Sequence, residues 1–240
     1  HDIHKIYKLL KTHVSENISA IELMSGFGVS LVTSKFPKLR NPFDIDYKWF
    51  LLVEVTGAIG IVERLESALK DCFDHDILLD AIIAQSQQQK DGLWNLREMT
   101  PEANKLAGAF CNSDTSVPIS KISNFIEDAY TAILIIHPNL RINSYGHIGD
   151  GNIHLNVLPP KEISKDDFLK NHPKVIEEVR MAINETTHSL GGSISAEHGI
   201  GRLKTKDLEI YANKARLKTI KSIKSAMDPN NIMNPGVIIS

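Results

Sequence analysis

The spacing of apolar residues along the first third of the chain predicts alternating helices and strands. Residues 3–14 carry Ile, Leu and Val at helical spacing, and residues 15–34 are expected to continue as a second helix, broken near two glycines. Residues 49–55 form an apolar run of strand length. An amphipathic helix over 61–72 and a strand over 77–83 follow it. This strand–helix–strand order is typical of one half of a ferredoxin-like sandwich.

A second group of the same kind follows residues 85–106, which are predicted to be mostly helical. A helix up to about residue 136, a hairpin at 141–158, a helix beginning near Pro173 and a strand over 193–196 make up this group. The two groups are expected to share one antiparallel sheet. The predicted fold class is therefore α+β, a ferredoxin-like sandwich with helices on one face and further helices at the ends of the chain. The domain boundaries that we predict are 1–45, 46–200 and 201–240.

The predicted hairpin has its turn at Asp150-Gly151, a dipeptide that favours a tight turn with positive φ. With that turn at the tip, His147 is expected directly opposite His154, with Cβ atoms roughly 5 Å apart. Strand alternation puts Tyr145 and Asn156 on the same face. Taken alone, such a pair is most simply interpreted as two hydrogen-bonded histidines on a polar sheet face.

A second stretch, residues 191–201, favours a different interpretation of the histidine pair. It is predicted to be a short strand that ends at Glu197 and His198 and then breaks on glycines. Two imidazoles and one carboxylate, with a coordination position left open, are the ligand set of a catalytic zinc-like centre. Either Glu197 or His198 could be the third ligand, because both lie at the strand end. The sequence therefore predicts a metal centre built on His147 and His154.

Composition limits the classes of partner. The 240 residues are 42% hydrophobic and 23% charged, as in ordinary globular proteins. The net charge is −2 and basic residues are scattered, so we expect no nucleic-acid binding. No apolar run reaches the length of a membrane span. Two cysteines are too few for a disulfide framework and favour a reducing compartment. We expect a cytoplasmic protein, with the mitochondrial matrix and peripheral membrane association as alternatives.

Four stretches of the chain together resemble the FAD-linked dehydrogenases of 2-hydroxy acids, in the vanillyl-alcohol oxidase superfamily. D-Lactate dehydrogenase and D-2-hydroxyglutarate dehydrogenase are members of this family. The stretches occur in the family's order and span most of the chain; they are residues 93–98, 146–154, 195–201 and 227–236. The resemblance covers only the family's C-terminal part. It implies that an FAD-binding domain is missing from this chain, which also has no Gly-rich phosphate loop.

The resemblance also implies a division of the chain and an activity. Residues 1–45 would lead in from the FAD-binding domain, 46–200 would form the substrate or cap domain, and 201–240 would form helices and a tail that face the flavin. The implied reaction is oxidation of a small D-2-hydroxy acid, D-lactate first, to the 2-oxo acid with FAD. An electron-transfer protein, a cytochrome or a quinone would accept the electrons, and a homodimer is allowed.

Roles for single residues follow from the same resemblance. His147, His154 and Glu197 would bind a divalent metal ion, with zinc the expected one. His198 would stay free to take a proton, and Arg97 would bind the substrate carboxylate. Two further assignments complete the implied site: Asn156 would bind the substrate, and Asn234 would lie near the flavin.

Two departures from the family pattern bear on the substrate. Asn112 stands where members that take a dicarboxylate tend to have Lys, and Pro101 stands where they tend to have Thr. Both favour D-lactate over D-2-hydroxyglutarate, and glycolate is a further alternative. A metal-dependent hydrolase acting alone is the rival enzyme class, because such a metal centre can also activate water. A cap domain that is inert without its partner half is the non-enzymatic alternative.

Overall fold

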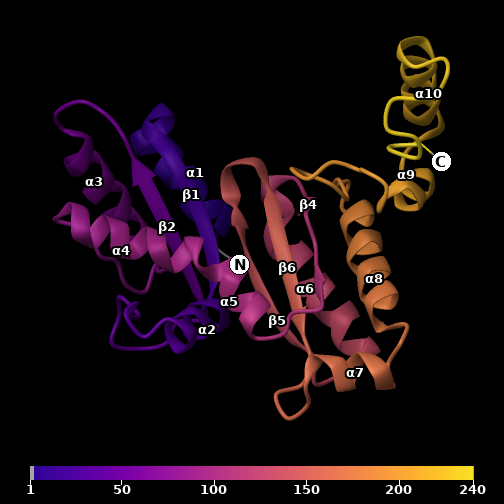
Figure 1. Cartoon of the computed structure of the whole chain (residues 1–240). Coiled ribbons are helices and arrows are strands. Elements are labelled where there is room, and N and C mark those ends of the chain that lie inside the picture. Colours follow the sequence, from indigo (N-terminus) through magenta and orange to yellow (C-terminus); the bar gives the residue numbers. More distant parts are fainter. Residues whose placement is uncertain (1–2, 240) are drawn as a thin grey trace.

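An antiparallel sheet forms the centre of the structure, a computed structural model that describes residues 3–239 (Figure 1). The strands in order across the sheet are β2 (Trp49–Val55), β1 (Ile18–Ser25), β5 (Arg141–His147) and β6 (Asn152–Leu158), with β3 (Cys111–Asn112) and β4 (Thr115–Ser116) both paired to β6. The expected α+β fold class is confirmed. His1, Asp2 and Ser240, which belong to the predicted end regions 1–45 and 201–240, lie outside the described residues.

One face of the sheet packs against long helices and forms the larger core. These helices are α1 (Ile3–Val14), α3 (Ile61–Asp74), α6 (Ile122–Ile136) and α8 (Val175–Ser189). Alternate strand residues fill this core, among them Ile21 and Leu23 of β1 and Ile153 and Leu155 of β6. Because side chains alternate along a strand, the residues between them point to the opposite face.

The opposite face is covered over β1 and β2 by a second group of helices. They are α2 (Gly26–Lys35), α4 (Gln87–Glu98) and α5 (Thr100–Leu106). These helices pack on Met24, Phe50 and Leu52 to form a smaller core. Over β5 and β6 the same face carries polar side chains instead, including Tyr145, His154 and Asn156. The division of this face into an apolar and a polar part positions the candidate site.

The expectation that residues 15–34 form a helix is wrong for its first part. Ile18–Ser25 is strand β1, which pairs with β2 on one side and β5 on the other, and only Gly26–Lys35 is helical. A central strand is covered on both faces, so Ile18–Ser25 lacks a regular apolar–polar alternation and its apolar spacing also fits a helix. The correction matters because β1 carries Glu22.

Two further predicted strands are absent from the described sheet. Residues 77–83 make no strand pairing, and Leu79 and Ile82 are exposed. Residues 193–196 contribute a single bridge, between Ser193 and Ser116. The segment from Ser193 onward is held instead by hydrogen bonds to Asp114, so it remains a loop beside β4, near the start of β6.

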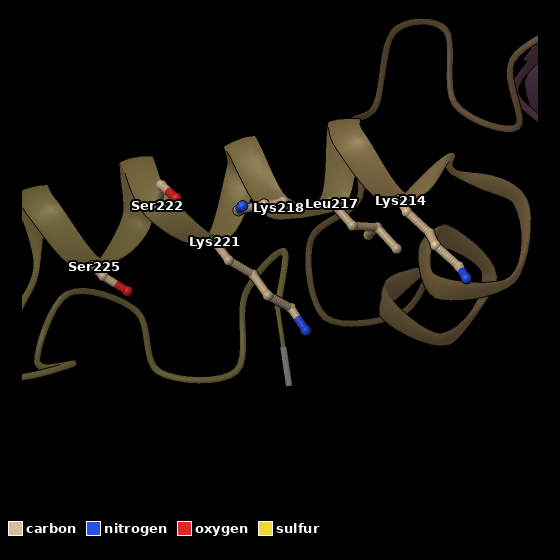
Figure 2. Close-up of a pocket in the computed structure, with 6 residues that line it drawn as sticks. All are labelled: Lys214, Leu217, Lys218, Lys221, Ser222 and Ser225. Carbon is tan, nitrogen blue, oxygen red and sulfur yellow. The ribbon is translucent and has the colours of Figure 1, made fainter.

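The remaining elements are short turns and the C-terminal helices. They are the 3-10 turns Ser15–Asn17, Ile119–Lys121 and Ile148–Asp150, and the helices α7 (Lys165–Asn171), α9 (Thr205–Tyr211) and α10 (Lys214–Met227). Helix α10 is basic on one side, where Lys214, Lys218 and Lys221 extend from the helix (Figure 2). None of its residues is buried, and it lies away from the sheet (Figure 1). Within residues 3–239 no helix has the length and apolar character to cross a bilayer.

Candidate functional site

The β5–β6 hairpin brings the two predicted histidines to one face, but with a different pairing. His147 lies opposite Asn152, and His154 lies opposite Tyr145. The connecting loop covers residues 148–151: a 3-10 turn with Ile148 buried in the core, followed by Gly151 at φ 74°. This loop is centred one residue earlier than the expected turn, which shifts the pairing register by two residues. A shift of two keeps every side chain on its face, so the shared face is as predicted.

Hydrogen bonds to the Nδ1 atoms orient both histidine rings. His147 Nδ1 lies 2.7 Å from Glu22 Oε1, and His154 Nδ1 lies 3.1 Å from the backbone oxygen of Ser113. Because both partners accept hydrogen bonds, a neutral ring at either position carries its proton on Nδ1 and keeps the lone pair on Nε2. This arrangement is the one that orients histidines for metal binding.

Glu197 completes a three-residue group with the two histidines. Its Oε1 atom lies 3.3 Å from His147 Nε2, and its Oε2 atom lies 4.0 Å from His154 Nε2. One potential ligand atom from each residue lies within 4.8 Å of the others. Two imidazole nitrogens and a carboxylate oxygen suit zinc, manganese or iron, so the residues fit the metal that the sequence implies.

Protonation differs between the two histidines. The hydrogen bond to Glu22 raises the pKa of His147, although partial burial opposes it. Burial lowers the pKa of His154, which favours the neutral ring that a metal ion needs. A divalent ion would compete with the proton at both rings, so metal binding at this site would release protons.

Asp114, which the sequence analysis missed, holds the loop that carries Glu197 and His198. Its buried carboxylate accepts the backbone N–H groups of Glu197 (3.1 Å) and His198 (2.8 Å). Burial alone would raise the pKa of Asp114, but these N–H groups and the charge of Lys204 outweigh it and lower the pKa. Asp114, Glu197 and His198 also form a second group of potential ligands. Because backbone donors already occupy Asp114, the group around the two histidines suits a metal better.

Arg97 and Asn156 lie beside the histidine pair. Arg97 is 8% exposed, donates from Nε to Glu22 Oε2 at 2.8 Å, and holds its guanidinium carbon 4.7 Å from the centre of the Tyr145 ring. Within the described residues, the buried Asn156 Nδ2 group has no hydrogen-bond partner. A buried donor without a partner is costly, so this atom is suited to bind a ligand.

His198 and Asn234 occupy different surroundings. The side chain of His198 is 63% exposed, with Nδ1 3.6 Å from Asp114 Oδ2 and its ring stacked 6.3 Å from that of His154. It is therefore at the site and free to exchange protons with solvent. Asn234 is exposed in the tail after α10, and no contact between it and the cluster is present in the described part of the chain.

Known proteins resemble this chain along nearly its whole length. Residues 1–238 match the family described as FAD linked oxidases, C-terminal domain. A D-2-hydroxyglutarate dehydrogenase of Stutzerimonas stutzeri (strain A1501) is 36% identical over 227 residues, covering 93% of this chain and 47% of that protein. A mitochondrial D-2-hydroxyglutarate dehydrogenase of Arabidopsis thaliana is 31% identical over 227 residues, covering 94% and 38%. A putative mitochondrial D-lactate dehydrogenase of Schizosaccharomyces pombe is 29% identical over 242 residues, covering 96% and 44%.

Solved structures share the fold. p-Cresol methylhydroxylase with substrate bound superposes with a TM-score of 0.63 and 16% identity, over 100% of this chain and 50% of that one. A 4-ethylphenol oxidase from Gulosibacter chungangensis superposes with a TM-score of 0.62 and 14% identity, over 99% of this chain and 51% of that one. This chain spans less than half the length of the three relatives named above. The family match and the order of the sequence motifs agree, and the chain therefore belongs to the FAD-linked oxidases, as their C-terminal domain.

Proposed function

We propose that this chain is the substrate-binding half of an FAD-dependent dehydrogenase that oxidises a small D-2-hydroxy acid, D-lactate first, to the 2-oxo acid. The observation that carries the proposal is the group formed by His147, His154 and Glu197, with both Nε2 atoms turned toward the carboxylate. The names of the relatives support this substrate class. In this proposal FAD is held mainly by a preceding domain, residues 46–200 bind the substrate, and the tail after 201 faces the flavin.

The side chains around this group have distinct roles in the proposal. Arg97 and Asn156 bind the substrate carboxylate, Arg97 through the guanidinium nitrogens beyond Nε and Asn156 through its unpartnered Nδ2. His198 takes the hydroxyl proton in this proposal, since its imidazole lies beside His154 and is open to solvent, to which it can pass the proton. When bound, the metal supplies Lewis-acid stabilisation of negative charge on the hydroxyl oxygen, and the flavin supplies the hydride acceptor.

Asn112 supports a substrate with one carboxylate. It lies directly across from Asn156 in the β3–β6 pairing, which puts it on the face of the histidine pair. A neutral amide here gives no cation for a second carboxylate, whereas D-lactate needs none. D-2-Hydroxyglutarate is the second candidate, because several relatives carry that substrate in their names. Steady-state kcat/KM for D-lactate, glycolate and D-2-hydroxyglutarate would rank the three.

Electron transfer and location belong to the same proposal. An electron-transfer protein, a cytochrome or a quinone reoxidises the flavin. The cytoplasm is the proposed location, with the mitochondrial matrix as the alternative that the names of the plant and yeast relatives favour. A homodimer is compatible with this proposal.

Two substitutions in adjacent residues test the roles at the site. Glu197→Gln should lose the metal and activity together, because the amide removes the negative ligand. His198→Gln should keep the metal and substrate binding but lower kcat by roughly 10²–10⁴-fold, the loss expected for a general base. Metal content and kcat of both variants in the full-length flavoprotein decide the matter. Metal loss in His198→Gln with metal retained in Glu197→Gln would reverse the two roles.

A further inference from the structure

Glu22 joins the two functional parts of the site. It lies in the central strand β1, directly opposite His147 in the β1–β5 pairing, and is only 5% exposed. Each carboxylate oxygen has its own partner: His147 Nδ1 is 2.7 Å from Oε1, and Arg97 Nε is 2.8 Å from Oε2. One buried side chain therefore contacts both a predicted metal ligand and the predicted carboxylate clamp.

The same contacts fix the guanidinium of Arg97 from two sides. Glu22 accepts its Nε–H, and the Tyr145 ring lies beneath its central carbon at 4.7 Å. A cation over an aromatic face and a buried charged hydrogen bond together restrict a side chain that is otherwise flexible. Arg97 comes from α4 and His147 from β5, so the strand between them sets their relative position.

We propose that Glu22 is a positioning residue that sets both the tautomer of His147 and the direction of Arg97. The metal and the substrate carboxylate would then be bound at a fixed distance and orientation to each other. This inference rests on the proposed function. In the neutral ring, the hydrogen bond at Nδ1 places the lone pair on Nε2, which lies 3.3 Å from Glu197 Oε1. Partners of this kind at a histidine ligand typically change metal affinity about 10–100-fold when they are removed.

Replacing the carboxylate by an amide of the same shape separates the two contacts. A glutamine has one accepting oxygen, whereas His147 and Arg97 both donate to Glu22, and Arg97 cannot accept. If the amide oxygen stays on Arg97, the NH₂ group faces His147 Nδ1. That nitrogen must then accept, so the proton moves to Nε2 and blocks the ligand atom. If the amide turns over, its NH₂ group faces the Arg97 Nε–H and displaces the clamp.

The test uses the full-length, FAD-loaded protein and measures zinc affinity by chelator competition, together with KM and kcat for D-lactate. Glu22→Gln should weaken zinc binding by about 10–100-fold, raise KM, or both, with the fold unchanged by circular dichroism. Nitrogen NMR of histidine-labelled, metal-free protein reports the His147 tautomer directly. Glu54→Gln is the matched control, because Glu54 also bonds several side chains, Ser19, Trp94 and Lys90, but lies on β2 and away from the histidines.

The outcomes separate this inference from the proposed function. Zinc affinity, KM and the His147 tautomer all unchanged in a folded Glu22→Gln protein would overturn the inference alone. A wild-type protein that binds no metal and oxidises D-lactate regardless would overturn the proposed function as well. If Glu22→Gln does not fold, Glu22→Asp carries the test. It keeps two accepting oxygens on a shorter side chain, and unchanged zinc affinity and KM in that variant would also count against the inference.

Discussion

At the scale of single residues, Asp114 is the side chain on which the loop of Glu197 and His198 depends. The loop has no strand pairing beyond Ser193, and Glu197 and His198 are exposed. Asp114 accepts the backbone N–H groups of both residues and lies 3.7 Å from Lys204 Nζ. A buried carboxylate that gathers backbone donors fixes a loop more firmly than exposed ion pairs do.

Asp114→Ala should therefore free the loop. The loss of charged hydrogen bonds should lower the free energy of unfolding by about 1.5–3 kcal/mol. Amide hydrogen exchange at Glu197 and His198 should accelerate, and metal binding should weaken. Asp150→Ala is the control, because Asp150 is an exposed turn carboxylate that bonds one backbone N–H, that of Asn152. Exchange rates at Glu197 and His198 equal to those of wild type would show that Asp114 does not hold the loop.

Sequence motifs pointed to the residues of the proposed site and missed those that hold them in place. His147, His154, Glu197 and His198 stand in dense, recognisable stretches, and the structure brings them together. Glu22 accepts a hydrogen bond from the ring of His147, 125 positions away. Asp114 accepts one from the backbone N–H of His198, 84 positions away. Such partners depend on which strands lie side by side. Glu22 was harder to recognise as a partner of His147 because its strand, β1, was expected to be a helix.

At the scale of elements, the loop between β5 and β6 sets the register of the site. Gly151 ends the 3-10 turn at φ 74°, and a Cβ atom there would lie 1.9 Å from the backbone oxygen of Val117. Both the left-handed backbone and the close approach require glycine. The loop thus packs against the segment before α6, which a tight two-residue turn at Asp150-Gly151 would not reproduce.

Gly151→Ala should destabilise the protein by about 2–5 kcal/mol, combining the cost of a left-handed alanine with that of a backbone clash. Gly92→Ala in α4 is the matched control, because nothing lies within 4 Å of its added Cβ. Gly92→Ala should raise the free energy of unfolding by about 0.5–1 kcal/mol, since alanine favours a helix. Chemical denaturation of the two variants measures both effects. Equal stability of Gly151→Ala and wild type would show that the loop can adopt another conformation.

Spacing within a segment predicted two elements well. It placed the amphipathic helix α3, which buries one face, and the strand β2, an apolar run of strand length, where they occur. It failed at β1, where burial from both sides removes the alternation, and at residues 77–83, where apolar residues find no strand to pair with. Strand pairing is a contact between distant segments, so spacing within one segment cannot establish it.

At the scale of the whole molecule, the sheet separates a closed core from a functional face. Helices α1, α3, α6 and α8 cover one side (Figure 1), and the polar part of the other side carries the histidine pair. The helix α10 has no buried residue, and Lys214, Lys218 and Lys221 extend from one side of it (Figure 2). In the proposed function, a preceding FAD-binding domain would bring the flavin to the histidine face.

The 240-residue chain expressed alone should accordingly be colourless and should not reduce a dye with D-lactate. It has no Gly-rich loop that could cradle the phosphates of a dinucleotide. The absorption spectrum of the purified chain, set beside that of the full-length protein, checks this expectation. A bound flavin spectrum in the 240-residue chain would refute it.

The most direct measurement is the anaerobic reduction of the flavin by D-lactate in the full-length protein, before and after metal removal. We expect flavin bleaching to slow by about 100-fold or more without metal, because Lewis-acid assistance is worth several kcal/mol and each 1.36 kcal/mol is tenfold in rate. Added zinc should restore the rate in wild type but not in His147→Ala or His154→Ala. Equally fast bleaching in metal-free wild-type protein would contradict the account.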